Sequence, residues 1–302
     1  MSSQRINAAC LSIDSVDVAY FTPSAEYLAS HPAATPADTA EVADSAPWTI
    51  TADSLRLQAN RGLYAMRGAT PVAGLDMNYI EVTNVALAVD SFYNRATSIT
   101  VPIREIRATE RCGLTLMAHG VFAMDSAMMY ARDFNLRTFA SQLTVDAAMG
   151  MGDLTTDPGL PLRLNARAEV ALSDVELAMP AMTSMLRSVP RSAPLVIKAD
   201  IEGTAGRLNI DTLRADMGSI LHLKADGTVT DVMNPDKING ALDIDGSVAS
   251  LNFMKPTLLE AELARQLNLP PMRIKGAYSF SHHIISCDYL WFCDRIRPDF
   301  KS

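Results

Sequence analysis

The chain has 302 residues, of which 48% are hydrophobic, 20% are charged and only 6% are aromatic, and its net charge is −8. This composition is typical of one or two folded domains and excludes a disordered or fibrous chain. The acidic balance and the lack of a basic stripe argue against a nucleic-acid partner, because phosphate binding needs clustered lysine and arginine.

The first part of the chain predicts a strand followed by a loop. Residues 1–22 are expected to form a partial β segment, since apolar and polar side chains alternate along residues 8–21. No signal peptide precedes this strand, so we expect the chain to be a piece of a longer protein. Residues 23–47 contain four prolines and an acidic excess, which predict a disordered, solvated loop, with an interaction tail as the alternative.

Residues 48–280 are predicted to form a sheet of many strands, because apolar and polar residues alternate along most of this stretch. The first clear strands are marked by Leu55, Leu57 and Ala59, and then by Val85, Leu87 and Val89. Shorter strands are expected at 99–106, 114–118, 132–139 and 142–148. At 162–172 we expect one long, one-sided strand whose apolar side chains are Leu162, Leu164, Ala166, Ala168, Val170 and Leu172.

A strand pattern recurs at 195–203, 221–229 and 242–248. Each copy alternates apolar and polar residues and contains or ends at a glycine, which is typical of a bend or bulge rather than of a phosphate-binding loop. Lys-Ala-Asp occurs at 198–200 and at 224–226. Strands of this kind build a sheet with one continuous apolar surface.

Two proline-led segments, at 180–188 and 256–268, have the apolar spacing of short amphipathic helices. We expect both helices to lie on the apolar face of the sheet. No apolar run is long enough to predict a membrane-spanning helix.

No catalytic, cofactor-binding or metal-binding motif of useful specificity is present, so neither an enzyme nor a cofactor is predicted. His282, His283, Cys287 and Cys293 form a metal-like group, but its spacing is atypical of zinc sites and we expect no metal. Residues 281–302 differ in composition from the preceding strands and are expected to be a disordered tail. For Glu110 and Arg111, an ion pair at a strand turn is favoured over a catalytic pair.

Three stretches resemble one family. Residues 79–93 are followed by residues 103–114, which end in Glu-Arg-Cys-Gly-Leu, and then by residues 134–143 with a Thr-x-x-Ser motif. Together they resemble the TamB proteins of Bacteroidetes, which are AsmA-like translocation and assembly modules. The resemblance covers residues 8 to about 280, and Cys112 stands where the family pattern has serine.

The resemblance implies an internal fragment of a periplasmic protein that is anchored in the inner membrane, with the anchor itself lacking here. It implies a mainly β fold, an elongated and curled antiparallel-type sheet that forms a β-groove over residues 48–280, with a few short amphipathic helices. The partners that it implies are phospholipid acyl chains and the outer-membrane assembly machinery. The implied function is inter-membrane phospholipid transport, outer-membrane protein assembly, or both.

The groove is expected to be lined by the apolar side chains of the most regular strands. The predicted lining residues are Leu162, Leu164, Ala166, Leu195, Ile197, Leu221, Leu223, Val229, Leu242, Ile244 and Val248. The alternative is a structural β-rich surface or stalk protein, similar to an adhesin or a passenger domain, in which a closed dry core buries the same residues.

Overall fold

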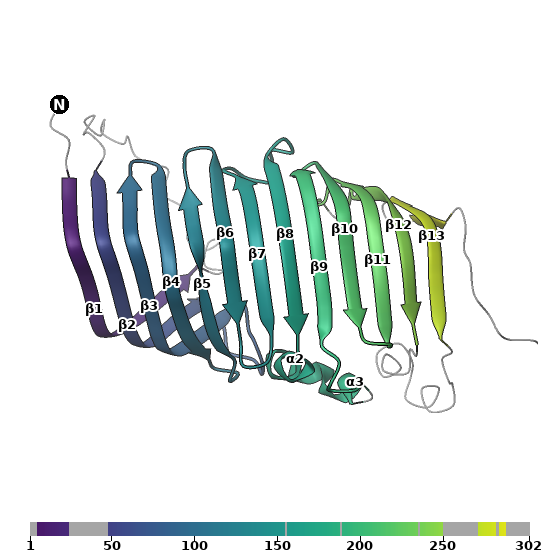
Figure 1. Ribbon diagram of the computed structural model, residues 1–302, viewed down its shortest axis with the longest axis horizontal. Helices are drawn as coiled ribbons and strands as arrows, with labels where there is room; N and C mark the ends of the chain where they lie inside the picture. Colours follow the sequence, from purple (N-terminus) through teal and green to yellow (C-terminus); the bar gives the residue numbers. More distant parts are fainter. Residues whose placement is uncertain are drawn as a thin grey trace, which may run out of the picture. The chain divides into compact units, whose positions relative to one another are not determined.

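The computed structural model describes residues 5–23, 48–154, 156–187, 189–234, 236–249, 271–281 and 284–287. Within these residues the chain is mainly β, with an open arrangement of strands and only short helices (Figure 1). The predicted mainly β fold class with a few short helices is therefore confirmed. Two compact units divide the chain, one made of residues 1–142 and 173–180 and the other of residues 143–172 and 181–302.

The first unit holds six strands, which follow one another in chain order in the sheet. The strands are β1 (Arg5–Thr22), β2 (Thr49–Met66), β3 (Tyr79–Arg95), β4 (Ser98–Glu110), β5 (Thr115–Met124) and β6 (Met128–Arg137). Leu55, Leu57 and Ala59 of β2 lie opposite Val89, Leu87 and Val85 of β3. These two predicted sets of apolar residues thus share one face, because directly paired residues point to the same side of a sheet.

One pair of strands departs from the expected antiparallel arrangement. β1 pairs with β2 in parallel, whereas the other pairs of this unit are antiparallel. A parallel pair needs a connection of a dozen or more residues, and residues 23–48 are long enough to provide it. Strand direction depends on the path of this connection, so the alternation of β1 alone could not reveal it.

The second unit holds the remaining strands and the second helical segment. Its strands are β7 (Gln142–Gly150), whose first residue is assigned to the first unit, β8 (Pro161–Val170), β9 (Leu195–Thr204), β10 (Arg207–Met217), β11 (Leu221–Thr230), β12 (Asn239–Val248), β13 (Met272–Ser281) and β14 (Ile284–Cys287). From β8 onward each described pair of neighbours is antiparallel. The predicted proline-led helix near residue 180 is present in a shorter form, as η1 (Pro180–Met182) and α3 (Thr183–Leu186).

The strand expected at 162–172 is too long by two residues. β8 ends at Val170, and Leu172 instead opens helix α2 (Leu172–Ala178), where it is only 3% exposed. Asp174 explains the change, because a carboxylate favours the first turn of a helix over a strand. Leu172 therefore belongs to a helix and not to the one-sided strand.

Several predictions fall outside the described residues. They are the loop at 24–47, the helix at 256–268, and residues 282–283 and 288–302 of the expected tail. Within that tail, Ile284–Cys287 forms β14 and pairs with residues 278–281 of β13.

β10 was not predicted from the sequence, and its register shows why. The pairing of β10 is shifted after Ile210 against both neighbours, β9 and β11. A bulge of this kind changes the phase of the side chains along the strand, so that Leu208 and Ile210 share a face with Leu213 and Ala215 although the alternation is broken. The apolar face continues through β10 even though the sequence does not alternate strictly.

Glycines permit close backbone approaches on this sheet. Gly203 and Gly227 have φ values of +146° and +143°, a region that is nearly closed to residues with a side chain. A Cβ atom at Gly227 would collide with the carbonyl oxygen of Ala241 and would lie 2.9 Å from the Cα of Leu242 on β12. The glycine is therefore required where β11 and β12 come together.

We expect Gly227→Ala to lower the free energy of unfolding by about 1–3 kcal/mol, because of this backbone strain and collision. Gly246→Ala is the matched control on β12. There the new Cβ would lie 3.2 Å from the flexible Cδ1 end of Leu223, with no positive φ to strain, so the loss should be smaller. Chemical denaturation measures both losses, and equal losses in the two variants would contradict this account.

Candidate functional site

The candidate site is the apolar face of the second unit, and strand register defines it. Because residues directly opposite each other on paired strands point to the same side, the pairs Leu164–Ile201, Leu223–Ala215 and Ile244–Ala225 share one face. Following the pairs from β8 to β12 places on that face Leu162, Leu164, Ala166, Leu195, Ile197, Leu221, Leu223, Val229, Leu242, Ile244 and Val248. The register thus brings all eleven predicted lining residues together, while their contact with lipid stays a prediction.

Two strands extend the apolar face beyond the prediction. β10 contributes Leu208, Ile210 and Leu213, which oppose residues of β9 and β11 on this face. β13 contributes Met272, Ile274, Tyr278 and Phe280, which oppose Val248, Gly246, Leu242 and Gly240 of β12. The alternation of β13 is readable in the sequence, so this part of the site was open to prediction.

The apolar face is only half-buried. Of the eleven predicted residues, Val229 is buried, with 8% of its surface exposed, and the other ten are of intermediate exposure. Aliphatic side chains in a two-layered domain are usually buried by the second layer. Within the described residues of this unit, the face therefore carries apolar surface that no second layer fully covers.

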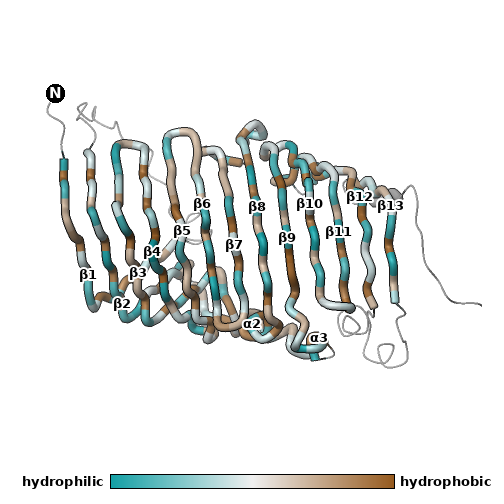
Figure 2. Tube along the Cα trace, viewed as in Figure 1, coloured by the Kyte–Doolittle hydropathy of each residue, from teal (hydrophilic) through white to brown (hydrophobic). Residues whose placement is uncertain are grey.

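The opposite face of the same strands is charged, and hydropathy alternates along each strand (Figure 2). The register aligns Arg167, Lys198, Arg214 and Lys224 side by side across β8, β9, β10 and β11. Like charges in direct opposition are destabilising. Acidic residues two positions further along the same strand offset this repulsion. The ion pair Arg167–Glu169 measures 3.1 Å and the ion pair Lys224–Asp226 measures 3.4 Å.

This geometry explains the repeated Lys-Ala-Asp sequence. At 224–226 the lysine and the aspartate point to the charged face, while Ala225 points to the apolar face and is 4% exposed. The same phase holds at 198–200, where Ala199 pairs with Ala166 and Leu213. The repeat is therefore a feature of a two-faced sheet rather than a chemical motif.

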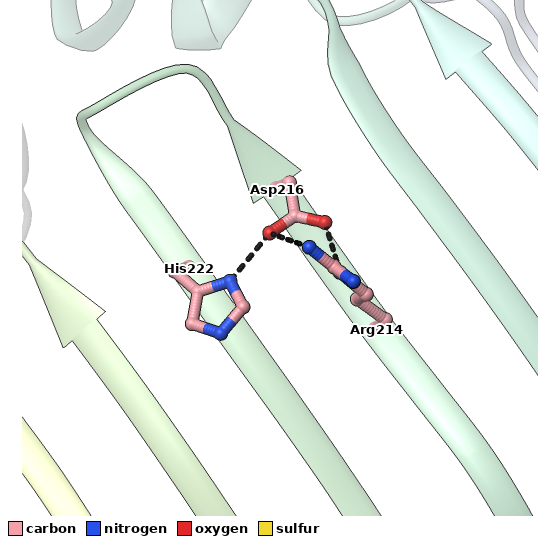
Figure 3. A network of polar contacts seen from close by, with 3 residues as sticks. All are labelled: Arg214, Asp216 and His222. Atoms are coloured by element: carbon pink, nitrogen blue, oxygen red, sulfur yellow. Dashed lines mark hydrogen bonds and ion pairs between the residues drawn. The ribbon is translucent and has the colours of Figure 1, made fainter.

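The charged face includes one three-residue cluster, which joins β10 to β11 (Figure 3). The guanidinium group of Arg214 bonds the carboxylate of Asp216, and the Nδ1 atom of His222 lies 2.5 Å from the Oδ1 atom of Asp216. The hydrogen bond from Arg214, followed by that from His222, lowers the pKa of Asp216 below its usual value. The cluster thus favours a charged Asp216 in the folded chain.

Because the pKa of Asp216 is lowered in the folded state, its contribution to stability is present above the usual aspartate pKa and is lost as the pH falls through the folded value. We expect Asp216→Asn to lower the free energy of unfolding near neutral pH by under about 1 kcal/mol, since the cluster is partly exposed. The difference from the parent protein should vanish at acid pH. Denaturant titrations across the acid range measure it.

Asp243→Asn is the matched control on the same face. Asp243 lies directly opposite Asp226, so removing its charge should cause no loss and can relieve like-charge repulsion. A pH-independent loss in Asp216→Asn, or an equal loss in Asp243→Asn, would rule out the proposed contribution of the cluster.

A second group of polar residues, in the first unit, holds helix α2. The hydroxyl groups of Thr138 and Ser141 both donate to Oδ2 of Asp174, the latter at 2.6 Å. At the other end of α2, the N–H of Leu75 donates to the carbonyl oxygen of Ala178 at 2.8 Å. The Thr-x-x-Ser motif and the loop before β3 therefore fix the two ends of one short helix.

The Glu-Arg-Cys-Gly-Leu motif supports the same helix indirectly, through the loop before β3. Arg111 does not pair with Glu110, so the expected ion pair is wrong. Its guanidinium group instead donates to the carbonyl oxygens of Val72 at 2.6 Å and Gly74 at 3.3 Å. The Oε2 atom of Glu110 accepts the main-chain N–H of Cys112 at 2.5 Å, and Glu110 is 2% exposed. Glu110 thus stabilises the turn after β4, and Arg111 stabilises the loop before β3.

We expect Asp174→Ala to release α2, because it leaves the hydroxyl groups of Thr138 and Ser141 without their shared acceptor. The loss in free energy of unfolding should be about 1–3 kcal/mol. Hydrogen exchange at the α2 amides should accelerate at the same time. Ser173→Ala, at an exposed position of the same helix, is the control and should change neither quantity; unchanged exchange in Asp174→Ala would show that the bonds do not hold the helix.

Metal and membrane-spanning features are not found in the part of the chain that the structure describes. No group of three or more histidine, cysteine, aspartate or glutamate residues there is placed to hold a metal ion. His282, His283 and Cys293 of the metal-like group lie outside the described residues. Of the described helices, none has the length and apolar character needed to cross a membrane.

Comparisons with known proteins add no further assignment. The chain matches no protein-family model, no curated protein and no solved structure. The function is therefore inferred from the apolar face and from the residues that surround it.

Proposed function

We propose that the apolar face binds the acyl chains of phospholipids, and that the chain is a segment of a TamB- or AsmA-like protein. In this proposal it serves inter-membrane phospholipid transport, outer-membrane protein assembly, or both, in the periplasm. The observation that carries the proposal is the half-buried row of aliphatic side chains from β8 to β13. An apolar surface of this extent needs a cover, and acyl chains provide one of matching chemistry.

The residue types on the face suit a sliding ligand. Leucine, isoleucine, valine and alanine present no hydrogen-bonding groups, so a hydrocarbon chain gains only from burial, at about 0.8 kcal/mol for each CH₂ group. Neighbouring positions offer similar surface, and a shift by one strand exchanges equivalent contacts. Movement along the face therefore meets small energy steps, as transport of a lipid tail requires.

The family resemblance supports the same function. The Glu-Arg-Cys-Gly-Leu and Thr-x-x-Ser stretches resemble TamB proteins, whose partners include phospholipid and the outer-membrane assembly machinery. The periplasmic location follows only from this resemblance. The structural alternative, a stalk protein with a closed core, requires that the same face be buried, and the intermediate exposure of ten of its eleven predicted residues speaks against it.

Two variants, each with one photoreactive residue on a different face of β12, test this proposal. At position 242 the residue replaces Leu242 on the apolar face, and at position 241 it replaces Ala241, which pairs with Thr228 on the charged face. We expect phospholipid to crosslink at position 242 and not at position 241. The measurement is mass spectrometry of lipid attached to the protein after irradiation in the presence of phospholipid.

A second pair of variants shows whether the apolar character matters. Leu223→Asp should reduce crosslinking at position 242 about tenfold or more, because it places a charge among the acyl contacts. Lys224→Asp makes a comparable change on the opposite face and should leave crosslinking unchanged. Equal crosslinking at positions 241 and 242, or none at either, would refute the assignment of the face.

A further inference from the structure

One end of the first unit carries a concentration of exposed apolar side chains. Their exposed fractions are 99% for Phe139, 68% for Met77, 59% for Val72, 56% for Met179, 42% for Leu177 and 41% for Leu75. They lie on the turn after β6, on the loop between β2 and β3, and on or just after helix α2. Here we call these six residues the apolar tip.

Hydrogen bonds bring the three segments of the apolar tip together. Thr138 and Ser141, which flank the turn that carries Phe139, bond Asp174 in the first turn of α2. Leu75 bonds Ala178 at the end of α2. Because a helix of seven residues is only about 10 Å long, the two attachment points are close together. The six side chains therefore form one local patch.

The two most exposed side chains of the apolar tip, Phe139 and Met77, make little contact with the protein that carries them. Phe139 touches almost nothing else in the described chain, since nearly all of its surface is exposed. The short turn around it is nevertheless fixed, because Thr138 also accepts from the N–H of Ser141 at 2.8 Å. An aromatic ring held outward on a fixed turn exposes its apolar surface to water and adds no hydrophobic stabilisation to the fold.

The carboxylates that support the apolar tip are buried. The buried charged residues among the described positions are Asp76, Glu110 and Asp174, and all three belong to the segments that support the apolar tip. Asp76 accepts the N–H groups of Val72 at 3.1 Å and Asn78 at 2.9 Å, and these bonds lower its pKa. The carboxylates are thus turned inward and used by the protein itself.

An exposed cation lies next to Phe139. Arg137 directly precedes the turn that carries Phe139, and it is exposed. Glu176, on α2, is half-buried. In a chain with a net charge of −8, the exposed charged group next to Phe139 is therefore a cation. Exposed apolar side chains beside a cation complement the surface of an anionic lipid bilayer.

We propose that the apolar tip inserts into the surface of an anionic lipid bilayer, with Phe139 as its main anchor and with Arg137 beside the lipid headgroups. A bilayer fits better than a folded partner because the patch projects from turns and a short helix and needs no shaped pocket to receive it. The inference names a membrane-contacting surface and does not depend on acyl chains occupying the apolar face of the second unit.

Vesicle co-flotation of the whole chain tests the inference. We expect binding to phosphatidylcholine vesicles that contain phosphatidylglycerol, and Phe139→Ser should weaken it about tenfold or more, since one large apolar side chain is lost from the bilayer. Met233→Ser is the matched control, because Met233 is an exposed apolar residue of the second unit, at 40% exposure. It should bind as the parent does.

Arg137→Glu isolates the electrostatic part. It should weaken binding to vesicles with phosphatidylglycerol and have little effect on binding to phosphatidylcholine alone. Phe139 is so exposed that its replacement should leave the thermal unfolding midpoint unchanged, which verifies that weaker binding does not reflect misfolding.

A tryptophan at position 139 gives an independent readout. Its fluorescence should shift to shorter wavelength on addition of the same vesicles, and tryptophan at position 233 should show no shift. Equal binding of the parent and Phe139→Ser, or a Phe139→Ser variant that changes oligomeric state and not vesicle binding, would overturn the inference. Lipid crosslinking at position 242 in Phe139→Ser reports separately on the apolar face, so the two proposals can fail independently.

Discussion

The register between neighbouring strands is the constraint on which the rest of this structure depends. Apart from the bulge in β10, the strands from β8 to β13 alternate, so a slip of one residue in any pair would move its apolar side chains to the charged face. The charged face opposes such a slip, because it would break the contact of His222 on β11 with Asp216 on β10 and that of Lys275 on β13 with Asp245 on β12. Where β10 breaks the alternation, a bulge restores the phase, and the apolar face continues without interruption.

A sheet built in this way is stabilised differently from a two-layered domain. Among the residues that the structure describes, the strands satisfy their backbone groups laterally, and the apolar side chains gain from contact with the neighbours beside them instead of from a second layer above. Val229 and Ala225 become buried in this way, at 8% and 4% exposure, while the larger leucine and isoleucine side chains stay half-exposed. The remaining apolar surface is the thermodynamic reason to expect a hydrophobic ligand.

The sequence was sufficient to predict which residues share the apolar face, because alternation is a local property. Leu162, Leu195 and Leu242 could each be assigned to a face from their own strands, and their faces coincide because antiparallel pairing in chain order is the simplest connection. The sequence was insufficient where the outcome depends on distant parts of the chain. Nothing near β1 sets its direction, and the alternation of β8 does not show that Leu172 belongs to α2. The partner of Asp174 lies 36 residues away at Thr138, which no spacing rule identifies.

The motifs that carry the family resemblance have a structural explanation in this chain. Arg111 of Glu-Arg-Cys-Gly-Leu holds the loop that bonds the end of α2, and both polar residues of Thr-x-x-Ser hold its beginning. The same explanation accounts for the departure at Cys112. Glu110 accepts the main-chain N–H of that residue, a group that every amino acid except proline provides, so cysteine in place of serine preserves this hydrogen bond. The support of α2 therefore depends on the backbone of this turn, and the motif can vary at position 112 without losing it.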